Sequence, residues 1–196
     1  MVKNIFPIPI YENVIEEDIF KDIKINTLNY IKNHPGLFST PWSCPTKTTL
    51  FSTRSISIDG LNEQIKQSVN SYIKSWVKEP NTLAFSLHNL WINISEKYSY
   101  QESHVHLTPY YTTMFSGVIY IDVKPNSGDL ILENPLTSHL LSSPQNLIPE
   151  RIKITPKDGK IIIFPPWLSH SVTQNQIDYN RISISFNVSV SPLKPS

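Results

Sequence analysis

The sequence predicts a mainly β domain, in which two N-terminal helices pack on one face of a β-sandwich or barrel. Apolar residues recur at helical spacing in two segments before residue 80, and from residue 84 they alternate with polar residues at every second position. Two helices followed by a run of strands is the order expected where helices cover one face of a sheet. A chain of 196 residues is long enough for one such domain with a sizeable core, so we expect residues 1–196 to form a single domain.

The first part of the chain, residues 1–83, is predicted to form an N-terminal arm and two supporting helices. Residues 4–12 alternate around two prolines, which is typical of an edge strand or an extended arm. The segment 37–57 is rich in Ser, Thr and Pro, so we expect a loop there, with a short strand near Phe51.

Two segments show the helical spacing. The first helix is expected over 15–33, where Pro35-Gly36 stops it. The second is expected over 61–78, where Asp59 can cap the start and Pro80 ends the helix. Both helices should turn an apolar stripe toward one outer face of the β region. The stripes are Ile15, Ile19, Ile23, Tyr30 and Ile31 in the first helix, and Leu61, Ile65, Val69, Tyr72, Ile73 and Trp76 in the second.

The β region is expected over residues 84–190, with its longest internal loop at 136–150. In the last strand a polar face, which begins at Arg181, alternates with an apolar face. A polar face can meet solvent or line a pocket, and the presence of Arg181 near histidine-bearing strands favours a pocket. The candidate strands are 84–95, 102–108, 114–123, 128–134, 151–155, 160–165, 169–174 and 181–190.

Three histidines of the β region are candidate metal ligands. His104 and His106 are one residue apart on a predicted strand, so their side chains should share one face. His170 lies on a later strand and can join them only if the sheet closes back on itself. Imidazole is a suitable ligand for iron, and Fe(II) oxygen chemistry needs a metal held on one face with open positions opposite. Arg181 and Tyr120, on neighbouring strands, could then clamp a dicarboxylate beside the metal.

Four short motifs occur in order in this region and resemble those of a known family. Over residues 85–190 the chain resembles the 2-oxoglutarate- and Fe(II)-dependent oxygenase superfamily, and more narrowly its small bacterial and phage members. The resemblance implies a double-stranded β-helix, the jelly-roll fold of cupins, over residues 84–190. It also implies a dioxygenase that hydroxylates a substrate and releases succinate and CO₂. The motifs are His104-Val105-His106, Ser116-Gly117-Val118-Ile119-Tyr120, Phe164-Pro165-Pro166-Trp167-Leu168-Ser169-His170 and Arg181-Ile182-Ser183-Ile184-Ser185-Phe186-Asn187.

The same resemblance implies the cofactors and the residues that hold them. Fe(II) would be the metal, and 2-oxoglutarate and O₂ the co-substrates, whereas the prime substrate is not implied. The guanidinium fork of an arginine suits a carboxylate, which is the role expected of the arginine here. The implied roles are iron binding for His104, His106 and His170, pairing with the distal carboxylate of 2-oxoglutarate for Arg181, and hydrogen bonding to that carboxylate for Tyr120 and Ser183.

One position departs from the usual pattern, which is His-x-Asp followed later by a histidine. Here His106 replaces the aspartate, so three neutral imidazoles would leave the site one unit more positive. Three alternatives stay open. Glu102 could hold the metal with His104 and His170, or the site could be degenerate in a non-enzymatic jelly-roll binding or virion-associated module. A cupin-like metalloenzyme could also use three histidines without 2-oxoglutarate, but Arg181-Ile182-Ser183 argues against it.

Composition narrows the class of partner and the compartment. The net charge of +1 gives no bulk attraction to membranes or nucleic acid, which disfavours nucleic acid as a partner but leaves it open. The single cysteine, Cys44, allows neither an internal disulfide nor a Cys-rich zinc site. We find no segment typical of a signal peptide or a transmembrane helix. A cytoplasmic protein is therefore expected, and the resemblance leaves open a phage protein that acts in its host cell.

Overall fold

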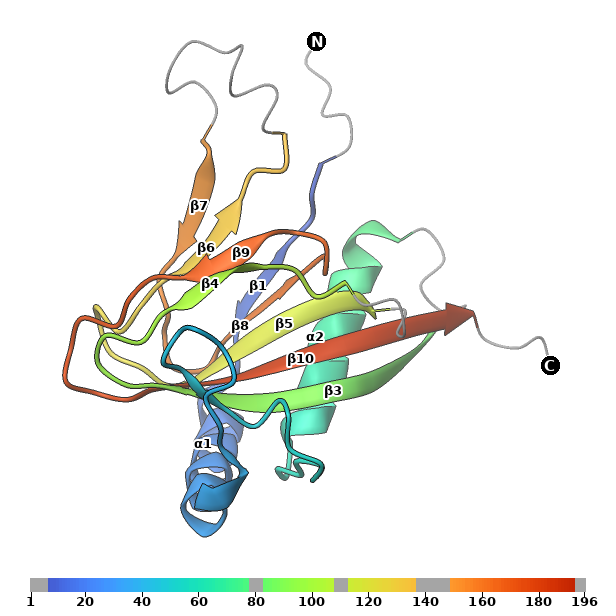
Figure 1. Cartoon of the computed structure of the whole chain (residues 1–196). Helices are drawn as coiled ribbons and strands as arrows, with labels where there is room; N and C mark the ends of the chain where they lie inside the picture. The colour runs from blue at the N-terminus through green and yellow to red at the C-terminus, as the bar shows by residue number, and fades with distance from the viewer. Residues whose placement is uncertain (1–6, 78–82, 108–112, 137–148, 193–196) are drawn as a thin grey trace.

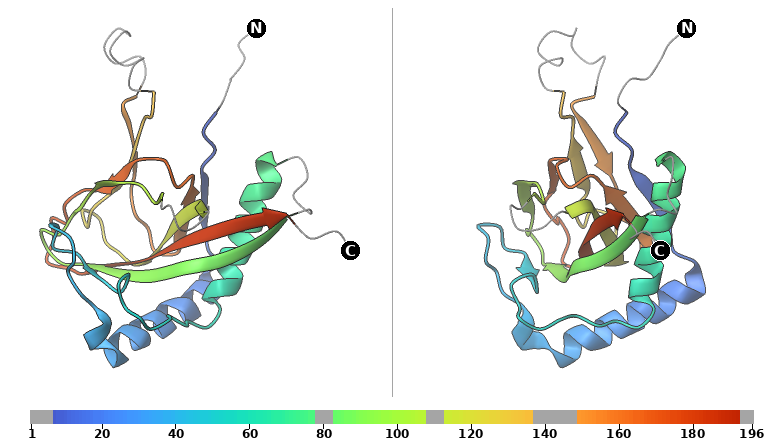
Figure 2. Two further views of the ribbon diagram at one scale, coloured as in Figure 1. Left: turned by 45° about the vertical axis from the view of Figure 1, so that its right-hand side comes forward. Right: turned by 90° about the vertical axis from the view of Figure 1, so that its right-hand side faces the viewer.

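The computed structural model describes residues 7–77, 83–107, 113–136 and 149–192. Two antiparallel sheets lie across from each other, and two helices cover the outside of the larger sheet (Figures 1 and 2). The predicted mainly β architecture with N-terminal helices is therefore confirmed. The assignment of all 196 residues to one domain stays a prediction. No helix within the described ranges is both long and apolar enough to cross a membrane.

The larger sheet has six strands, and the last strand of the chain lies in the middle of it. The last strand, β10 (Arg181–Pro192), pairs on one side with β3 (Leu83–Ser95), with Ser183 opposite Asn93, and on the other with β5 (Thr113–Asp122), with Ser183 opposite Tyr120. In spatial order the strands are β1 (Tyr11–Val14), β8 (Lys160–Phe164), β5 (Thr113–Asp122), β10 (Arg181–Pro192), β3 (Leu83–Ser95) and β2 (Lys47–Thr48).

The smaller sheet has four short strands and carries two of the predicted histidines. In the pair formed by β4 (Gln101–His104) and β9 (His170–Val172), His104 lies directly opposite His170, although the two are 66 residues apart in the sequence. In spatial order the strands are β4 (Gln101–His104), β9 (His170–Val172), β6 (Leu130–Glu133) and β7 (Arg151–Ile154). The predicted strands 102–108 and 169–174 are longer than β4 and β9, so His106 lies just beyond the end of β4.

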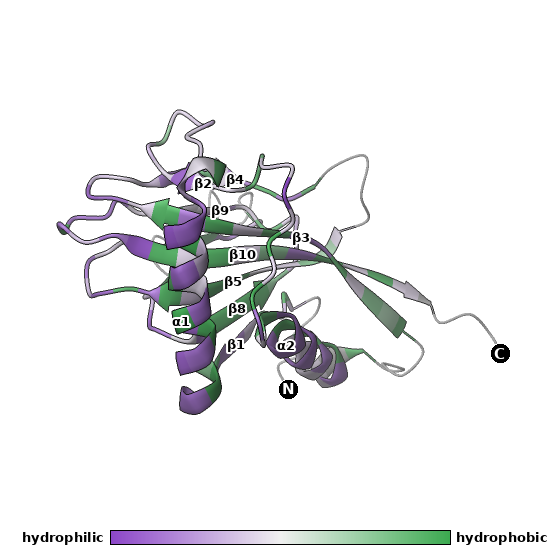
Figure 3. Ribbon diagram, turned by 90° about the horizontal axis from the view of Figure 1, so that it is seen from below, coloured by the Kyte–Doolittle hydropathy of each residue, from purple (hydrophilic) through white to green (hydrophobic). Residues whose placement is uncertain are grey.

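The helices α1 (Glu17–Asn33) and α2 (Leu61–Trp76) pack on the outer face of the larger sheet (Figure 3). Burial of apolar side chains is the main force that holds them there. A one-turn 3₁₀ helix, Pro35–Leu37, follows α1. The predicted packing on one outer face is confirmed. The buried residues of this core include Ile23, Ile65, Val69 and Tyr72 from the helices and Ile92, Ile119, Ile161, Ile184 and Phe186 from the sheet.

Three local predictions in the first part of the chain are wrong in detail. The N-terminal strand is an edge strand, as expected, but it spans Tyr11–Val14, and residues 1–6 lie outside the described ranges. The short strand is Lys47–Thr48, whereas Phe51 is 61% exposed in the following turn. Asp59 does not cap α2. The cap is Gly60, whose φ of 79° is left-handed and is accessible to glycine at little cost.

The alternation predicted for the last strand decides where the site forms. Along β10 the apolar residues face the helices, whereas the polar residues that begin at Arg181 face the smaller sheet. Gly117 of the adjacent β5 allows Phe186 of β10 to pack closely against β5, because glycine has no side chain. A Cβ there would lie 2.3 Å from Cζ of Phe186 and 2.8 Å from the carbonyl oxygen of Ile162. The polar face of β10 therefore lines the space between the two sheets instead of facing solvent.

Candidate metal and co-substrate site

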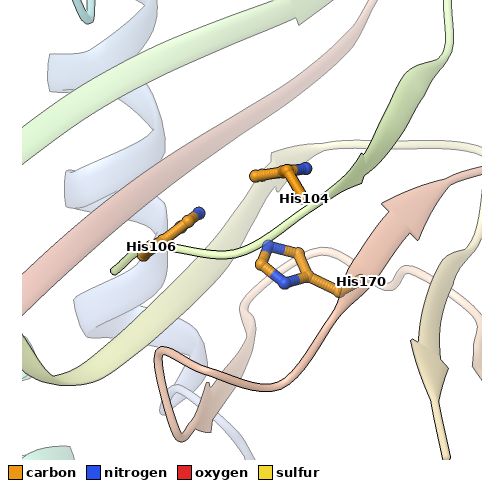
Figure 4. Close-up of side chains that lie close together, drawn as sticks. All are labelled: His104, His106 and His170. Carbon is orange, nitrogen blue, oxygen red and sulfur yellow. The ribbon is translucent and has the colours of Figure 1, made fainter. Parts of the chain in front are cut away.

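The three predicted histidines meet between the two sheets (Figure 4). One ring nitrogen from each lies within 4.8 Å of the corresponding nitrogens of the other two. His104 and His170 are opposite each other in the β4–β9 ladder. His106 is held beyond the end of β4, where its backbone N–H donates to the carbonyl oxygen of Pro166 at 2.8 Å. Such a cluster could hold a metal ion.

Hydrogen bonds set the tautomer of each ring. Nδ1 of His104 lies 2.8 Å from the carbonyl oxygen of Glu102, and Nδ1 of His170 lies 2.9 Å from that of Leu168. A carbonyl oxygen can only accept, so Nδ1 carries the proton in both rings. The Nε2 lone pairs of both histidines are therefore free, which is the state in which a histidine binds a metal.

Nδ1 of His106 hydrogen-bonds to side chains, whereas Nδ1 of His104 and of His170 hydrogen-bonds to a backbone carbonyl. Nδ1 of His106 lies 2.9 Å from Oδ1 of Asn187 and 2.9 Å from Oγ of Ser116. The Ser116 hydroxyl in turn donates to the same Asn187 oxygen at 2.7 Å. Ser116 and Asn187 are both buried, so this pair fixes the ring orientation. The sequence motifs contain Ser116 and Asn187, but nothing in their spacing indicates this role.

Burial keeps the three rings uncharged at neutral pH. Burial, together with the neighbouring His104, lowers the pKa of His170 to about 3 and that of His106 to about 4. Burial also lowers the pKa of His104. Neutral imidazole is the ligand form, so the site does not have to lose protons to accept a metal at neutral pH.

We expect the metal-free protein to lose stability as the pH falls from about 6.5 toward 4. Histidines in the unfolded chain bind protons below about 6.5, whereas His106 and His170 in the folded chain bind them only near 4 and 3. Each should lower the free energy of unfolding by about 1.4 kcal/mol per pH unit in this window. Denaturant titrations across the window measure this, and His170→Gln should flatten the slope. The same slope in both proteins would contradict burial as the cause.

Glu102 does not belong to the cluster. The β4–β9 ladder has a register shift between Gln101 and His104, so the simple alternation that would place Glu102 on the same face as His104 is broken. The side chain of Glu102 is exposed, and its backbone carbonyl is the acceptor for His104. Among the described residues, the three histidines are the group placed to share an ion.

The histidine cluster opens into a cavity that contains the predicted carboxylate-binding residues. The cavity is small, with a volume of about 30 Å³. Three inward residues of β10, Arg181, Ser183 and Ser185, line it at intervals of about 7 Å. The next inward residue of this strand is Asn187, the partner of His106. The other lining residues of the cavity include Tyr120, Asn93 and Gln101, with apolar walls from Trp91, Val118, Leu130, Phe164 and Val172.

Arg181 is a buried cation without a counter-charge. Its side chain is 3% exposed, it makes no ion pair within the described ranges, and its Nε has no hydrogen-bond partner there. The guanidinium carbon lies 5.2 Å from the centre of the Tyr120 ring. Because an unpaired buried charge is costly, the cavity is suited to an anionic ligand at this end.

Tyr120 and Ser183 stand beside Arg181 and form a row with Asn93 across three strands. The Tyr120 hydroxyl is buried without a hydrogen bond to any described residue. Burial raises its pKa, and Arg181 opposes this, so the hydroxyl stays protonated and can donate. Asn93 donates from Nδ2 to Ser185 at 3.2 Å, while its buried Oδ1 has no partner in the described structure. Alternation along the strand places Asn93 on the same face as Trp91, and both residues line the cavity.

The aromatic residues around the motif Phe164-Pro165-Pro166-Trp167 divide into two kinds. Phe164 is 2% exposed and its ring centre lies 4.7 Å from that of His170, so it packs against the cluster. Trp167, in contrast, is 45% exposed. The turn between β8 and β9 carries Trp167 outward while it places the Pro166 carbonyl against His106.

Comparison with protein families gives one match. The family described as "Putative 2OG-Fe(II) oxygenase" matches residues 89–187, which is just over half of the chain. The matched range includes all six residues predicted for the site. Among curated proteins, none matches this sequence.

Solved structures, among them two prolyl hydroxylases, share the fold of this chain at low sequence identity. A prolyl-4-hydroxylase of Pseudomonas putida aligns with a TM-score of 0.65 and 11% identity, over 92% of each chain. A prolyl hydroxylase of Trichoplax adhaerens, solved in complex with a hypoxia inducible factor peptide fragment, aligns at 0.63 and 14%, over 92% of this chain and 82% of that one. AviO1 of Streptomyces viridochromogenes aligns at 0.64 and 15%, over 96% and 92%. The predicted double-stranded β-helix is thereby confirmed.

Proposed function

Since this chain belongs to the family of 2OG-Fe(II) oxygenases, and is therefore a dioxygenase that depends on 2-oxoglutarate and Fe(II), we propose that it hydroxylates a C–H bond of a prime substrate. One oxygen atom of O₂ would enter the substrate as a hydroxyl group, and the other would enter succinate as 2-oxoglutarate loses CO₂. The observation that carries the proposal is the buried, unpaired Arg181, which lies in the same cavity as the three histidines.

In this proposal the metal end of the cavity is built by the three histidines. His104, His106 and His170 would bind Fe(II) through the Nε2 atoms that their Nδ1 hydrogen bonds leave free. Iron supplies the activation of O₂ when it is bound. Three neutral ligands leave the ion with its full charge of +2, and the carboxylate at the metal end of the co-substrate would offset one unit of it.

The opposite end would hold the co-substrate. Arg181 would pair with the distal carboxylate of 2-oxoglutarate, and the hydroxyl groups of Tyr120 and Ser183 would donate to the same carboxylate. These contacts would aim the keto-acid end at the histidines. The apolar walls from Trp91, Val118 and the other lining residues would keep water from the reacting atoms.

The Asn187–Ser116 pair should control metal affinity through His106. We expect Asn187→Leu to weaken Fe(II) binding by about 10- to 100-fold, because the ring would lose the acceptor that sets its orientation and tautomer. Asn187→Asp keeps an acceptor and should retain most of the affinity. Anaerobic titration with Fe(II) measures both, with the exposed helix variant Asn62→Leu as a matched control. Equal affinity in Asn187→Leu and the control would show that His106 does not need this partner.

Turnover of 2-oxoglutarate tests the function itself. We expect the purified protein with Fe(II) and O₂ to convert 2-oxoglutarate slowly to succinate and CO₂, even without a prime substrate. His170→Ala should abolish this turnover by loss of metal, and Arg181→Ala should reduce it by weakening co-substrate binding. A wild-type protein that neither binds Fe(II) nor consumes 2-oxoglutarate would instead support the non-enzymatic jelly-roll module. The cytoplasmic location and the phage origin stay predictions.

A further inference from the structure

A second cavity meets the histidine cluster outside the proposed co-substrate cavity. It has a volume of about 320 Å³, and His104 and His106 line both cavities. Trp42 and Leu50 belong to its lining and not to that of the first cavity, while Trp91 is shared. A ligand in the second cavity would therefore reach the same two histidines as a ligand in the first.

One wall of this cavity is an open strand edge. Six consecutive residues, from Gln101 to His106, line it, and the first four are β4, the outermost strand of the smaller sheet. The His106 N–H turns toward Pro166, so by alternation the backbone N–H and C=O of Val105 turn the other way. Within the described ranges neither group of Val105 has a hydrogen-bond partner, and the residue is 43% exposed.

The opposite wall is held in place. The Ser99 hydroxyl donates to the carbonyl oxygen of Pro45 at 2.9 Å, and the Thr46 hydroxyl donates to that of Tyr100 at 2.9 Å. These bonds tie the segment that carries Trp42 to the connection between β3 and β4. The trough along β4 is therefore pre-formed, with apolar and aromatic groups on one side and strand backbone on the other.

We propose that this trough is the prime-substrate site and that the substrate is an extended polypeptide segment, which adds as a strand along the open edge at residues 103–107. The inference rests on the proposed function. An added strand would lie about 4.8 Å from this edge and would satisfy the free backbone groups of Val105. Alternate side chains of the segment would point toward His104 and His106, and those between would point away.

Charge narrows the class of segment. Glu102 is the one charged side chain among the described residues that line the trough, and no described Lys or Arg lines it. A segment with a lysine or arginine near the modified residue is thus favoured over one with an acidic or phosphorylated residue. The same absence of cations disfavours nucleic acid as the occupant.

The test uses the Fe(II)·2-oxoglutarate holoenzyme under anaerobic conditions and a pool of random decapeptides. Peptides retained by the protein are labelled, and their affinity is measured by fluorescence anisotropy, which does not require turnover. We expect basic peptides to be enriched. N-methylation of single backbone amides should weaken binding by roughly 2- to 10-fold at alternate positions, because each such amide loses one strand bond.

A charge swap supplies the matched control. Glu102→Lys should reverse the preference between a peptide with lysine and the same peptide with glutamate, whereas Glu63→Lys on α2 should leave it unchanged. The inference is overturned if the pool yields no binder, if N-methylation has the same effect at every position, or if free amino acids compete as well as peptides. In each of those cases retained consumption of 2-oxoglutarate would show that the proposed function stands without it.

Discussion

Replacing Arg181 by alanine is expected to weaken 2-oxoglutarate binding by about 2–4 kcal/mol, or roughly 30- to 1,000-fold. The guanidinium is buried, has no acidic partner among the described residues, and stands beside the Tyr120 ring in the cavity that reaches the histidines. A charge-assisted bidentate pair with a carboxylate would be lost. Anaerobic calorimetry of 2-oxoglutarate binding to the Fe(II)-loaded protein measures the effect directly.

Two further variants separate this role from an ordinary structural one. Arg181→Lys should restore only part of the affinity, because an ammonium group cannot match the two oxygens of a carboxylate as the guanidinium fork does. Arg181→Met should raise the free energy of unfolding of the ligand-free protein, since it removes an unpaired buried charge. The exposed Arg54→Ala is the control. Unchanged 2-oxoglutarate affinity in Arg181→Ala would place the carboxylate site elsewhere.

Replacing His106 should change the metal site more than any other single substitution outside His104 and His170. His106→Ala removes a proposed ligand, so its loss of Fe(II) affinity should exceed the roughly 10- to 100-fold that a lost outer partner costs. His106→Asp restores the usual ligand set of the family and lowers the charge of the site by one unit. It should still bind Fe(II), but the shorter side chain would leave Asn187 and Ser116 without their ring partner.

The comparison of His106→Asp with the wild type distinguishes a functional three-histidine site from a degenerate one. In a functional site the wild type binds Fe(II) at least as well as the aspartate variant, and the two differ in how much 2-oxoglutarate they consume. In a degenerate site the wild type binds weakly and the aspartate strengthens binding. Anaerobic Fe(II) titration followed by a succinate assay gives both quantities, and His34→Ala, a histidine outside the cluster, is the control.

Local spacing was enough to predict the elements that carry the site. Two-residue alternation placed Arg181 and Ser183 on one face of a strand, as the structure has them. It also placed His104 and His106 together on a strand over 102–108, whereas β4 ends at His104. Such patterns are visible in a sequence because the burial of a strand face depends on residues only two positions apart. The boundaries were less accurate at Phe51 and Asp59, where a turn and a left-handed glycine, not apolar spacing, determine the structure.

Tertiary structure decided which of these residues lie next to one another. The β4–β9 register set His104 opposite His170, and the shift in that ladder removed Glu102 from the metal face. Contact between Asn187 and His106, and the lack of an acid beside Arg181, likewise depend on strands brought together from distant parts of the chain. The sequence by itself determined the kinds of side chain and the faces they occupy. Their meeting required closure of the two sheets, because pairing between distant strands is set by packing and ladder register, which no local period records.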